Sequence, residues 1–227
     1  MDAQLADRLA SVDARIADAV RASGRSSSDI TRIVVTKFHP TTLIEELYRL
    51  GVRDMGENRQ QELTAKVDAL GDYADVTWHF IGQAQTNKAR AIRAAADVVH
   101  SVDRAKLADA LDAAAADDVL DVLLQVNLTD DPDRGGVPPA EVDALASHVA
   151  ALASLRIRGV MAVAPLHDDP ARAFERLADS ARRARAVVPD ASWISAGMTA
   201  DFSEAIAMGA THLRIGSAIT GPRPTRG

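Results

Sequence analysis

The stretch that decides the fold is "ITRIVVTKFHP", residues 30–40. Ile33, Val34 and Val35 continue a β-branched, apolar run that is typical of a strand buried on both faces. Lys37 closes this strand. A lysine at such a position either extends its ammonium group to water or holds an amine in a pocket whose chemistry requires one. The residues that follow the other strands decide between these two roles.

Strand-like and helix-like segments alternate along the chain after a first helix predicted over Ala3–Ala22. The predicted strands are Arg32–Lys37, Arg53–Met55, Thr77–Gly82, Asp97–Asp103, Val119–Leu128, Arg156–Val163, Ser192–Ser195 and Thr211–Gly216. The predicted helices that follow the first seven are Thr41–Leu50, Asn58–Leu70, Thr86–Ala96, Arg104–Ala116, Pro139–Ala153, Pro170–Val187 and Asp201–Met208. Eight such units, the last with a short tail, predict a single (β/α)8 TIM barrel domain over residues 1–227 with an extra N-terminal helix. An open, doubly wound sheet is the alternative.

The composition is that of an ordinary globular protein and argues against several functional classes. The chain is 47% apolar and 26% charged, and no apolar run approaches the roughly 20 residues that cross a bilayer. Its net charge of -6 gives no reason to expect nucleic acid or an anionic membrane as a partner. Cysteine is absent and the six histidines show no metal-ligand spacing, so neither a disulfide nor a metal site is expected. The N-terminus lacks the layout of a secretory signal, and we expect a cytoplasmic protein.

The residues at the carboxyl ends of the predicted strands are those that form the active face of a β/α barrel. Lys37 ends the first strand and Arg214 lies in the last. Small residues of the type that bind phosphate in such barrels surround the ends of strands seven and eight: Ser195, Gly197, Thr199, Gly216 and Ser217. An anion site and a lysine in one mouth suggest a phosphorylated carbonyl compound held as a Schiff base. The attacking amine must be neutral, a state that burial and a cation such as Arg214 both favour.

Each of these residues also has an ordinary structural interpretation. Lys37 could end a strand with its ammonium in water, and glycine and serine are common turn residues after strands. His79 could be a paired histidine of the core, and Asn58 could cap the helix that follows it. A barrel aldolase that needs no cofactor is a further alternative, with Glu57 and Asp201 as its candidate acid and base. A mobile surface loop is expected at residues 130–136, "DDPDRGG".

Seven segments together closely resemble the pyridoxal phosphate (PLP) homeostasis proteins, a PLP-binding family that is also described as alanine racemase N-terminal-domain-like. In chain order they are "VVTKFHP", "MGEN", "WHFIGQAQTNK", "VHSVDR", "LLQVNLTDD", "LRIRGVMAV" and "SAGMTADFSEAIAMGATHLRIGSAITG". The resemblance implies a barrel of fold-type III that holds PLP as an aldimine on Lys37, with Arg214 facing the pyridine nitrogen. The cofactor-binding residues that it implies are Lys37, Asn58, His79, Met161, Ser195, Gly197, Met198, Thr199, Arg214, Gly216 and Ser217.

The resemblance also implies that the protein holds and supplies PLP rather than catalysing a reaction with it. The expected partners are PLP and the apo-enzymes that receive it, and we expect a monomer, with a weak dimer as the alternative. Because a guanidinium only donates hydrogen bonds, Arg214 would leave the pyridine nitrogen unprotonated and the ring a poor electron sink. The competing hypothesis is a racemase-like PLP enzyme. The related racemases take a catalytic tyrosine from a second domain and partner subunit, whereas Tyr48 and Tyr73 lie in or after predicted helices here.

Overall fold

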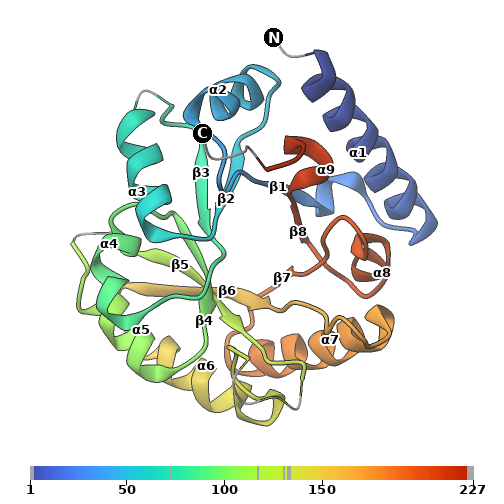
Figure 1. The fold of residues 1–227 in the computed structure, drawn as a ribbon. Helices are drawn as coiled ribbons and strands as arrows, with labels where there is room; N and C mark the ends of the chain where they lie inside the picture. The colour runs from blue at the N-terminus through green and yellow to red at the C-terminus, as the bar shows by residue number, and fades with distance from the viewer. Residues whose placement is uncertain (1–2, 72, 117, 130, 132–133, 224–227) are drawn as a thin grey trace.

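The computed structural model describes residues 3–71, 73–116, 118–129, 131 and 134–223, and it forms a closed barrel of parallel strands in chain order (Figure 1). The strands are β1 (Thr31–Val35), β2 (Asp54–Glu57), β3 (Thr77–Phe80), β4 (Val98–Val102), β5 (Leu120–Gln125), β6 (Leu155–Met161), β7 (Trp193–Ser195) and β8 (His212–Ile215). The last strand pairs with the first, with Ile33 opposite Arg214 and Val34 opposite Ile215. The predicted (β/α)8 barrel is therefore confirmed, and the open sheet is not what forms.

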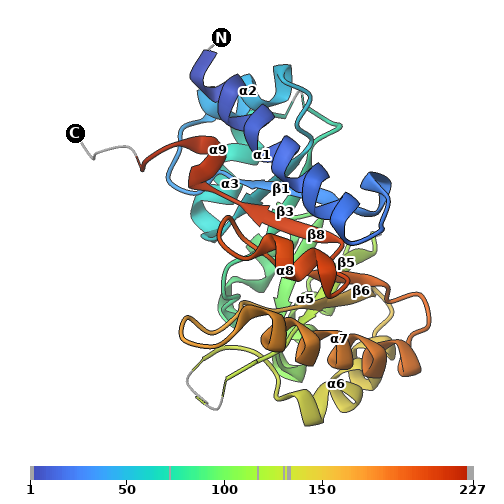
Figure 2. The same cartoon turned by 90° about the vertical axis from the view of Figure 1, so that its right-hand side faces the viewer.

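Helices surround the barrel, as seen from its end in Figure 1 and from its side in Figure 2. They are α1 (Ala3–Ala22), α2 (Thr41–Arg49), α3 (Gln60–Ala69), α4 (Ala89–Arg93), α5 (Ala105–Asp112), α6 (Val142–Ala150), α7 (Pro170–Val187), α8 (Phe202–Ala207) and α9 (Ser217–Thr220). Short 3-10 turns are η1 (Ser27–Asp29), η2 (Thr86–Lys88) and η3 (Pro139–Glu141). The additional helix α1 lies against α8 and α9, because its apolar stripe, which includes Leu5 and Leu9, is buried there. No helix among the described residues is long and apolar enough to cross a membrane.

Side chains alternate along each strand between the outer layer under the helices and the inside of the barrel. The outer layer is a large apolar core, to which Leu107, Phe174 and Phe202 contribute side chains that are at most 2% exposed. The inside holds a much smaller apolar cluster of Val98, Leu123 and Met161, with Trp193 packed against it. The remaining interior positions are therefore open to polar side chains.

Several helices begin later or end earlier than the sequence predicts. The helix expected over Thr86–Ala96 starts as a 3-10 turn, η2, and is α-helical only over Ala89–Arg93. Strand β2 continues to Glu57 and Arg59 is still extended, so α3 begins at Gln60 rather than at Asn58. The loop expected to be mobile lies partly outside the described residues, at 130 and 132–133. In its described part, the Asn127 amide donates to two loop carbonyl oxygens, those of Asp131 and Arg134.

Candidate functional site

A cavity of about 460 Å³ opens at the carboxyl ends of the strands, where the fold predicts the active face. Val35 of β1 forms part of its wall, and Lys37 lies two residues further along the same face of the chain. The described residues that line it are Val35, Lys37, Phe38, His39, Asn58, Ile81, Val163, Met198, Thr199, Ala200, Arg214, Gly216, Ser217, Thr220, Gly221 and Arg223. The volume suits a small cofactor.

Seven of the residues predicted from the sequence are brought together in this cavity: Lys37, Asn58, Met198, Thr199, Arg214, Gly216 and Ser217. The other four lie elsewhere. Met161 belongs to the apolar cluster inside the barrel, and His79 and Ser195 are buried in hydrogen bonds there. Gly197 has a φ of +92°, and a Cβ at this position would lie 2.8 Å from the Ala205 Cβ, so its role is to let the turn pack against α8.

The pleat of the strands explains why three of these residues lie away from the cavity. His79, Met161 and Ser195 point into the barrel, as expected, but one layer below the mouth. Ile81 and Val163, two residues beyond His79 and Met161 on the same faces, line the cavity instead. The two-residue pleat sets the face on which each residue lies, whereas its height in the barrel depends on strand tilt and stagger.

A buried clamp holds the end of β1, immediately before Lys37. Thr36 donates from Oγ1 to Glu57 Oε1 at 2.6 Å, and Lys66 donates from Nζ to the same carboxylate oxygen at 2.5 Å. Lys66 also donates to the Thr36 carbonyl oxygen at 2.9 Å. Burial raises the pKa of Glu57, while Lys66 opposes that shift. Glu57 Oε1 thus accepts from both Thr36 and Lys66, while Oε2 is buried without a partner. Because Lys66 also bonds the Thr36 carbonyl oxygen, the clamp fixes the backbone that carries Lys37.

Phe38 is the described non-glycine residue with a left-handed backbone, at a φ of +70°. Such a conformation costs of order 1–3 kcal/mol and is kept only where the surroundings impose it. Its amide donates to Glu62 Oε2 at 2.8 Å, which holds the turn in place. Around its ring lie Arg223, with its guanidinium carbon 3.7 Å from the centroid, and Arg59 at 5.1 Å. The strained turn therefore places the Phe38 ring at the mouth of the cavity, where the two arginine side chains pack against it.

The charges of the cavity are positive. Lys37, Arg214 and Arg223 line it, and none of the described lining residues is acidic. Arg214 is only 5% exposed and donates to Ser195 Oγ at 2.6 Å and to the Ala162 carbonyl oxygen at 2.8 Å. Burial lowers the pKa of Arg214 to about 10, which leaves the guanidinium charged at neutral pH. Such a cavity suits an anionic ligand.

The polar groups of the cavity fit a phosphorylated carbonyl compound. Asn58 Oδ1 is buried without a hydrogen-bond partner in a residue that lines the cavity, and such an acceptor costs free energy until a donor meets it. Turns at Met198–Ala200 and Gly216–Ser217, which offer hydroxyl and amide donors, lie at the same cavity as Lys37. An amine, an anion-binding edge and an unpaired acceptor are thus collected in one space.

Several residues of the cavity were missed by sequence reasoning. Phe38 and His39 follow Lys37 directly in the sequence, and this adjacency is the signal that could have placed them at the cavity. Burial is the main cause that lowers the pKa of His39, followed by the charges of Lys66 and Arg8. Arg223 lies after α9, in a segment without the helix or strand periodicity from which its position could have been predicted.

The aldolase alternative receives no support from the geometry. Glu57 is fully buried in the clamp with Lys66, and it does not line the cavity. Asp201 accepts from the Met198 amide at 2.6 Å, as a cap of the turn before α8. Neither carboxylate therefore reaches a substrate at Lys37. Within the described residues there is also no group of metal-ligating side chains.

Known proteins share this architecture and sequence over almost the whole chain. The profile of the family described as "Alanine racemase, N-terminal domain" matches residues 16–224. The pyridoxal phosphate homeostasis protein of Mycobacterium tuberculosis is 38% identical over 245 residues, which cover 99% of this chain and 95% of that protein. The protein of the same name from Escherichia coli is 36% identical over 226 residues, which cover 96% of this chain and 97% of the relative.

Solved structures give the same result. PipY of Synechococcus elongatus, in the form described as having PLP bound, has a TM-score of 0.83 at 34% identity and covers 96% of this chain and 100% of its own. Alanine racemase from Corynebacterium glutamicum has a TM-score of 0.66 at 16% identity, over 84% of this chain and 55% of its own, and shows the common fold alone. The chain therefore belongs to the alanine racemase N-terminal domain family, alongside the pyridoxal phosphate homeostasis proteins.

Proposed function

We propose that this protein binds PLP as a Schiff base on Lys37 and serves in the cellular supply of PLP. The observation that carries the proposal is the meeting of Lys37, the buried Arg214 guanidinium and the Gly216–Ser217 turn in one cavity. Its support from relatives is that proteins 36–38% identical over nearly the whole chain are named for PLP homeostasis. PipY, at 34% identity, is described with PLP bound.

Different residues of the cavity would bind different groups of PLP. The Lys37 amine would hold PLP through its aldehyde carbon, with the aldehyde oxygen released as water. The turns at Met198–Thr199 and Gly216–Ser217 receive the phosphate, with Arg223 as a cation at the rim. Arg214 would donate to the pyridine nitrogen, and Asn58 Oδ1, which has no partner within the protein, would accept from a donor on the ligand.

The same residues favour retention of PLP over chemistry on it. Bound PLP supplies an electron sink for reactions at amino-acid carbons, and that sink is strongest when the pyridine nitrogen carries a proton. A guanidinium has no proton-accepting atom and stays charged, so Arg214 keeps that nitrogen unprotonated. The tyrosines Tyr48 and Tyr73 contact each other with ring centroids 4.4 Å apart, and neither lines the cavity. These features favour a holder that passes PLP to apo-enzymes. We propose further, from the sequence alone, that this holder is cytoplasmic and monomeric.

Titration of the purified apo-protein with PLP tests this function. We expect the absorption band of a Schiff base to form in the wild type and in Lys106→Ala, since Lys106 is an exposed residue on α5. Lys37→Ala should retain at most weak, non-covalent binding and lack that band. Absence of the band in the wild type would contradict the proposal.

Catalysis by a racemase-like enzyme is the competing function. His39 is the residue of the cavity that could act as its base. His39 lines the cavity, and its lowered pKa leaves a neutral imidazole that could accept a proton at neutral pH. Incubation of the PLP-loaded protein with amino acids of both hands in deuterated water follows exchange of the α-proton. We expect exchange no faster than that of free PLP. Sustained turnover that His39→Ala abolishes would support the enzyme instead.

A further inference from the structure

A continuous chain of hydrogen-bonded side chains crosses the inside of the barrel, below the cavity. Its members come from five strands: Arg214 from β8, Ser195 from β7, His100 from β4, His79 from β3 and Asp54 from β2. Arg214 Nη1 donates to Ser195 Oγ at 2.6 Å, and Ser195 Oγ lies 2.9 Å from His100 Nδ1. His100 Nε2 lies 2.9 Å from His79 Nδ1, and His79 Nε2 lies 3.0 Å from Asp54 Oδ1.

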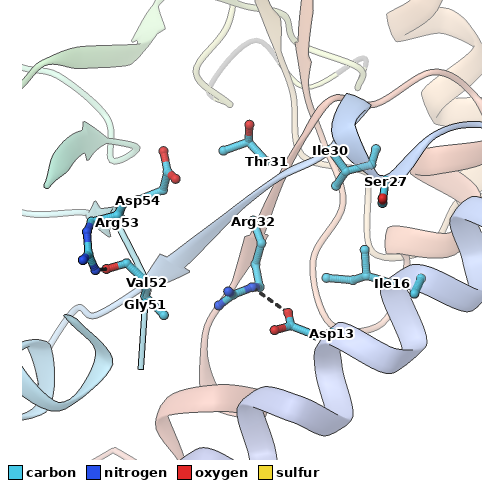
Figure 3. A pocket seen from close by; sticks show the side chains of 11 residues that line it. Asp13, Ile16, Ser27, Ile30, Thr31, Arg32, Gly51, Val52, Arg53 and Asp54 are labelled. Carbon is cyan, nitrogen blue, oxygen red and sulfur yellow. Dashed lines mark hydrogen bonds and ion pairs between the residues drawn. The ribbon is translucent and has the colours of Figure 1, made fainter. Parts of the chain in front are cut away.

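The two ends of this chain face different spaces. Arg214 lines the cofactor cavity, whereas Asp54 lines a second cavity of about 360 Å³ between α1 and the beginnings of β1 and β2 (Figure 3). Figure 3 shows that the lining of this second cavity also includes the ion pair between Arg32 of β1 and Asp13 of α1. The chain members between Asp54 and the upper cavity are at most 5% exposed. A buried polar chain of this length destabilises the protein unless every member is paired. The partner of each residue therefore determines which of its atoms donate and which accept.

The hydrogen bonds can point in only one direction when the histidines are neutral and Asp54 is ionised. Arg214 only donates, so Ser195 Oγ accepts from it, and the hydroxyl still has its own proton available for His100 Nδ1. A neutral imidazole carries a single N–H, so His100 donates from Nε2 to His79. His79 then donates from Nε2 to Asp54, and a carboxylate accepts it. The reverse direction would point a lone pair of His79 at the carboxylate.

The surroundings of His100 support the neutral state. Burial is the main cause that holds the pKa of His100 well below its usual 6.5, and the charge of the Arg214 guanidinium acts in the same direction. The chain therefore has a cation at the cofactor cavity, a carboxylate at the opposite end, and aligned dipoles between them. Such alignment strengthens each hydrogen bond in a low-dielectric interior.

We propose that Ser195, His100, His79 and Asp54 are positioning residues that hold the Arg214 guanidinium in one orientation toward the nitrogen of a bound pyridine aldehyde, an inference that rests on the proposed function. Ser195 Oγ and the Ala162 carbonyl oxygen anchor its two terminal nitrogens, so rotation would break both bonds. His100 in turn fixes the hydroxyl of Ser195, so that its lone pairs face Arg214. When His100 cannot accept, that hydroxyl is free to turn, and the hold on the ligand weakens.

The tautomers of two histidines give the first test, and it needs no ligand. In ¹⁵N NMR spectra of the wild-type protein at neutral pH, His79 and His100 should both be protonated on Nε2 and unprotonated on Nδ1. A proton on Nδ1 of either histidine would overturn the direction of the chain. Because this spectrum is recorded on the apo-protein, its outcome is independent of whether PLP binds.

A pair of substitutions at His100 gives the second test. His100→Phe keeps a ring of similar volume but removes both polar atoms, whereas His100→Gln keeps one acceptor and one donor. We expect PLP to bind about tenfold more weakly to His100→Phe, with a shifted absorption maximum, because the Ser195 hydroxyl loses the acceptor that keeps its lone pairs directed at Arg214. His100→Gln should recover much of the affinity and the wild-type maximum. Equal affinity and equal spectra in both variants, with wild-type thermal unfolding, would overturn the proposal.

The far end of the chain gives the third test, with a matched control in the same lower cavity. Asp54→Asn keeps an acceptor oxygen but removes the charge that anchors His79, whereas Asp13→Asn affects a carboxylate paired with Arg32. We expect a loss of PLP affinity of about two- to fivefold for Asp54→Asn and none for Asp13→Asn. No change at Asp54 would contradict transmission through the barrel. If the wild type bound no PLP, the proposed function would fail, while the tautomer test would still decide the direction of the chain.

Discussion

The outer layer of the barrel and its inside are built from opposite kinds of side chain. Between strands and helices the buried residues are almost all apolar, as Leu107 and Phe202 illustrate. Inside the barrel, Val98, Leu123 and Met161 form a small apolar cluster among the described residues, beside the hydrogen-bonded chain that ends at Arg214. The difference teaches that the outer layer supplies the free energy of folding, which leaves the inside available for side chains that serve the ligand.

The largest effect on stability should come from the outer layer. Leu107 is fully buried on α5, and Leu107→Ala removes buried methyl groups and leaves a cavity, at a cost of about 2–5 kcal/mol in the free energy of unfolding. Urea unfolding monitored by circular dichroism measures the change. Leu166→Ala serves as the control, since Leu166 is 85% exposed and should change stability little. Equal effects at the two positions would break the comparison.

The inside of the barrel should make the protein sensitive to acid. Burial is the main cause that lowers the pKa of His212 to about 3 from 6.5. Between pH 6.5 and about 3 the unfolded chain therefore binds a proton that the folded chain does not. Stability should fall as the pH falls through this window, by roughly 1.4 kcal/mol per pH unit for one such histidine.

Substitution of His212 isolates that contribution from the other titrating groups. Glu57 acts in the opposite direction because burial raises its pKa, so the slope of the wild type alone does not report one residue. His212→Phe keeps a ring against Trp193, whose centroid lies 4.2 Å away, and removes the titration. The free energy of unfolding of this variant should depend less steeply on pH between 6 and 4, by up to one proton. Parallel curves for the two proteins would show that His212 is not held neutral.

The smallest effect is expected at the exposed rim. Arg223 lines the cavity and lies over the Phe38 ring, in contact with solvent. Arg223→Ala should weaken PLP binding by roughly two- to fivefold, because an exposed ion pair contributes little. The difference from wild type should shrink at high salt. Arg182→Ala, on the exposed side of α7, is the matched control, and an equal loss there would mean that the rim is not specific.

The barrel itself could be predicted from the sequence because eight alternating strands and helices in a chain of this length commonly form a closed β/α barrel. Lys37, Asn58 and Arg214 were placed at the cavity for the same reason, since they lie at or near strand ends. The periodicity of a strand does not determine the height of a residue inside the barrel. The position of His79 and Met161 one layer below the cavity could therefore not be predicted.

Contacts between distant segments could not be predicted either. The hydrogen-bonded chain joins His79 to Asp54, 25 residues earlier in the chain, and His100 to Ser195, 95 residues later. Each of these residues looks like an ordinary interior position of its own strand, and only the order of strands around the closed barrel makes them neighbours. The resemblance to a known family identified Ser195 and His79 as important but assigned them to the ligand.

The central claim is that one amine, Lys37, forms the covalent bond to PLP, and the chain is well suited to a direct test because its only lysines are at 37, 66, 88 and 106. Borohydride reduction of the PLP-loaded protein followed by peptide mass spectrometry locates the modified residue. We predict one phosphopyridoxyl group per chain, on the peptide that contains Lys37. Modification spread over Lys88 and Lys106, or an unmodified Lys37, would contradict the account.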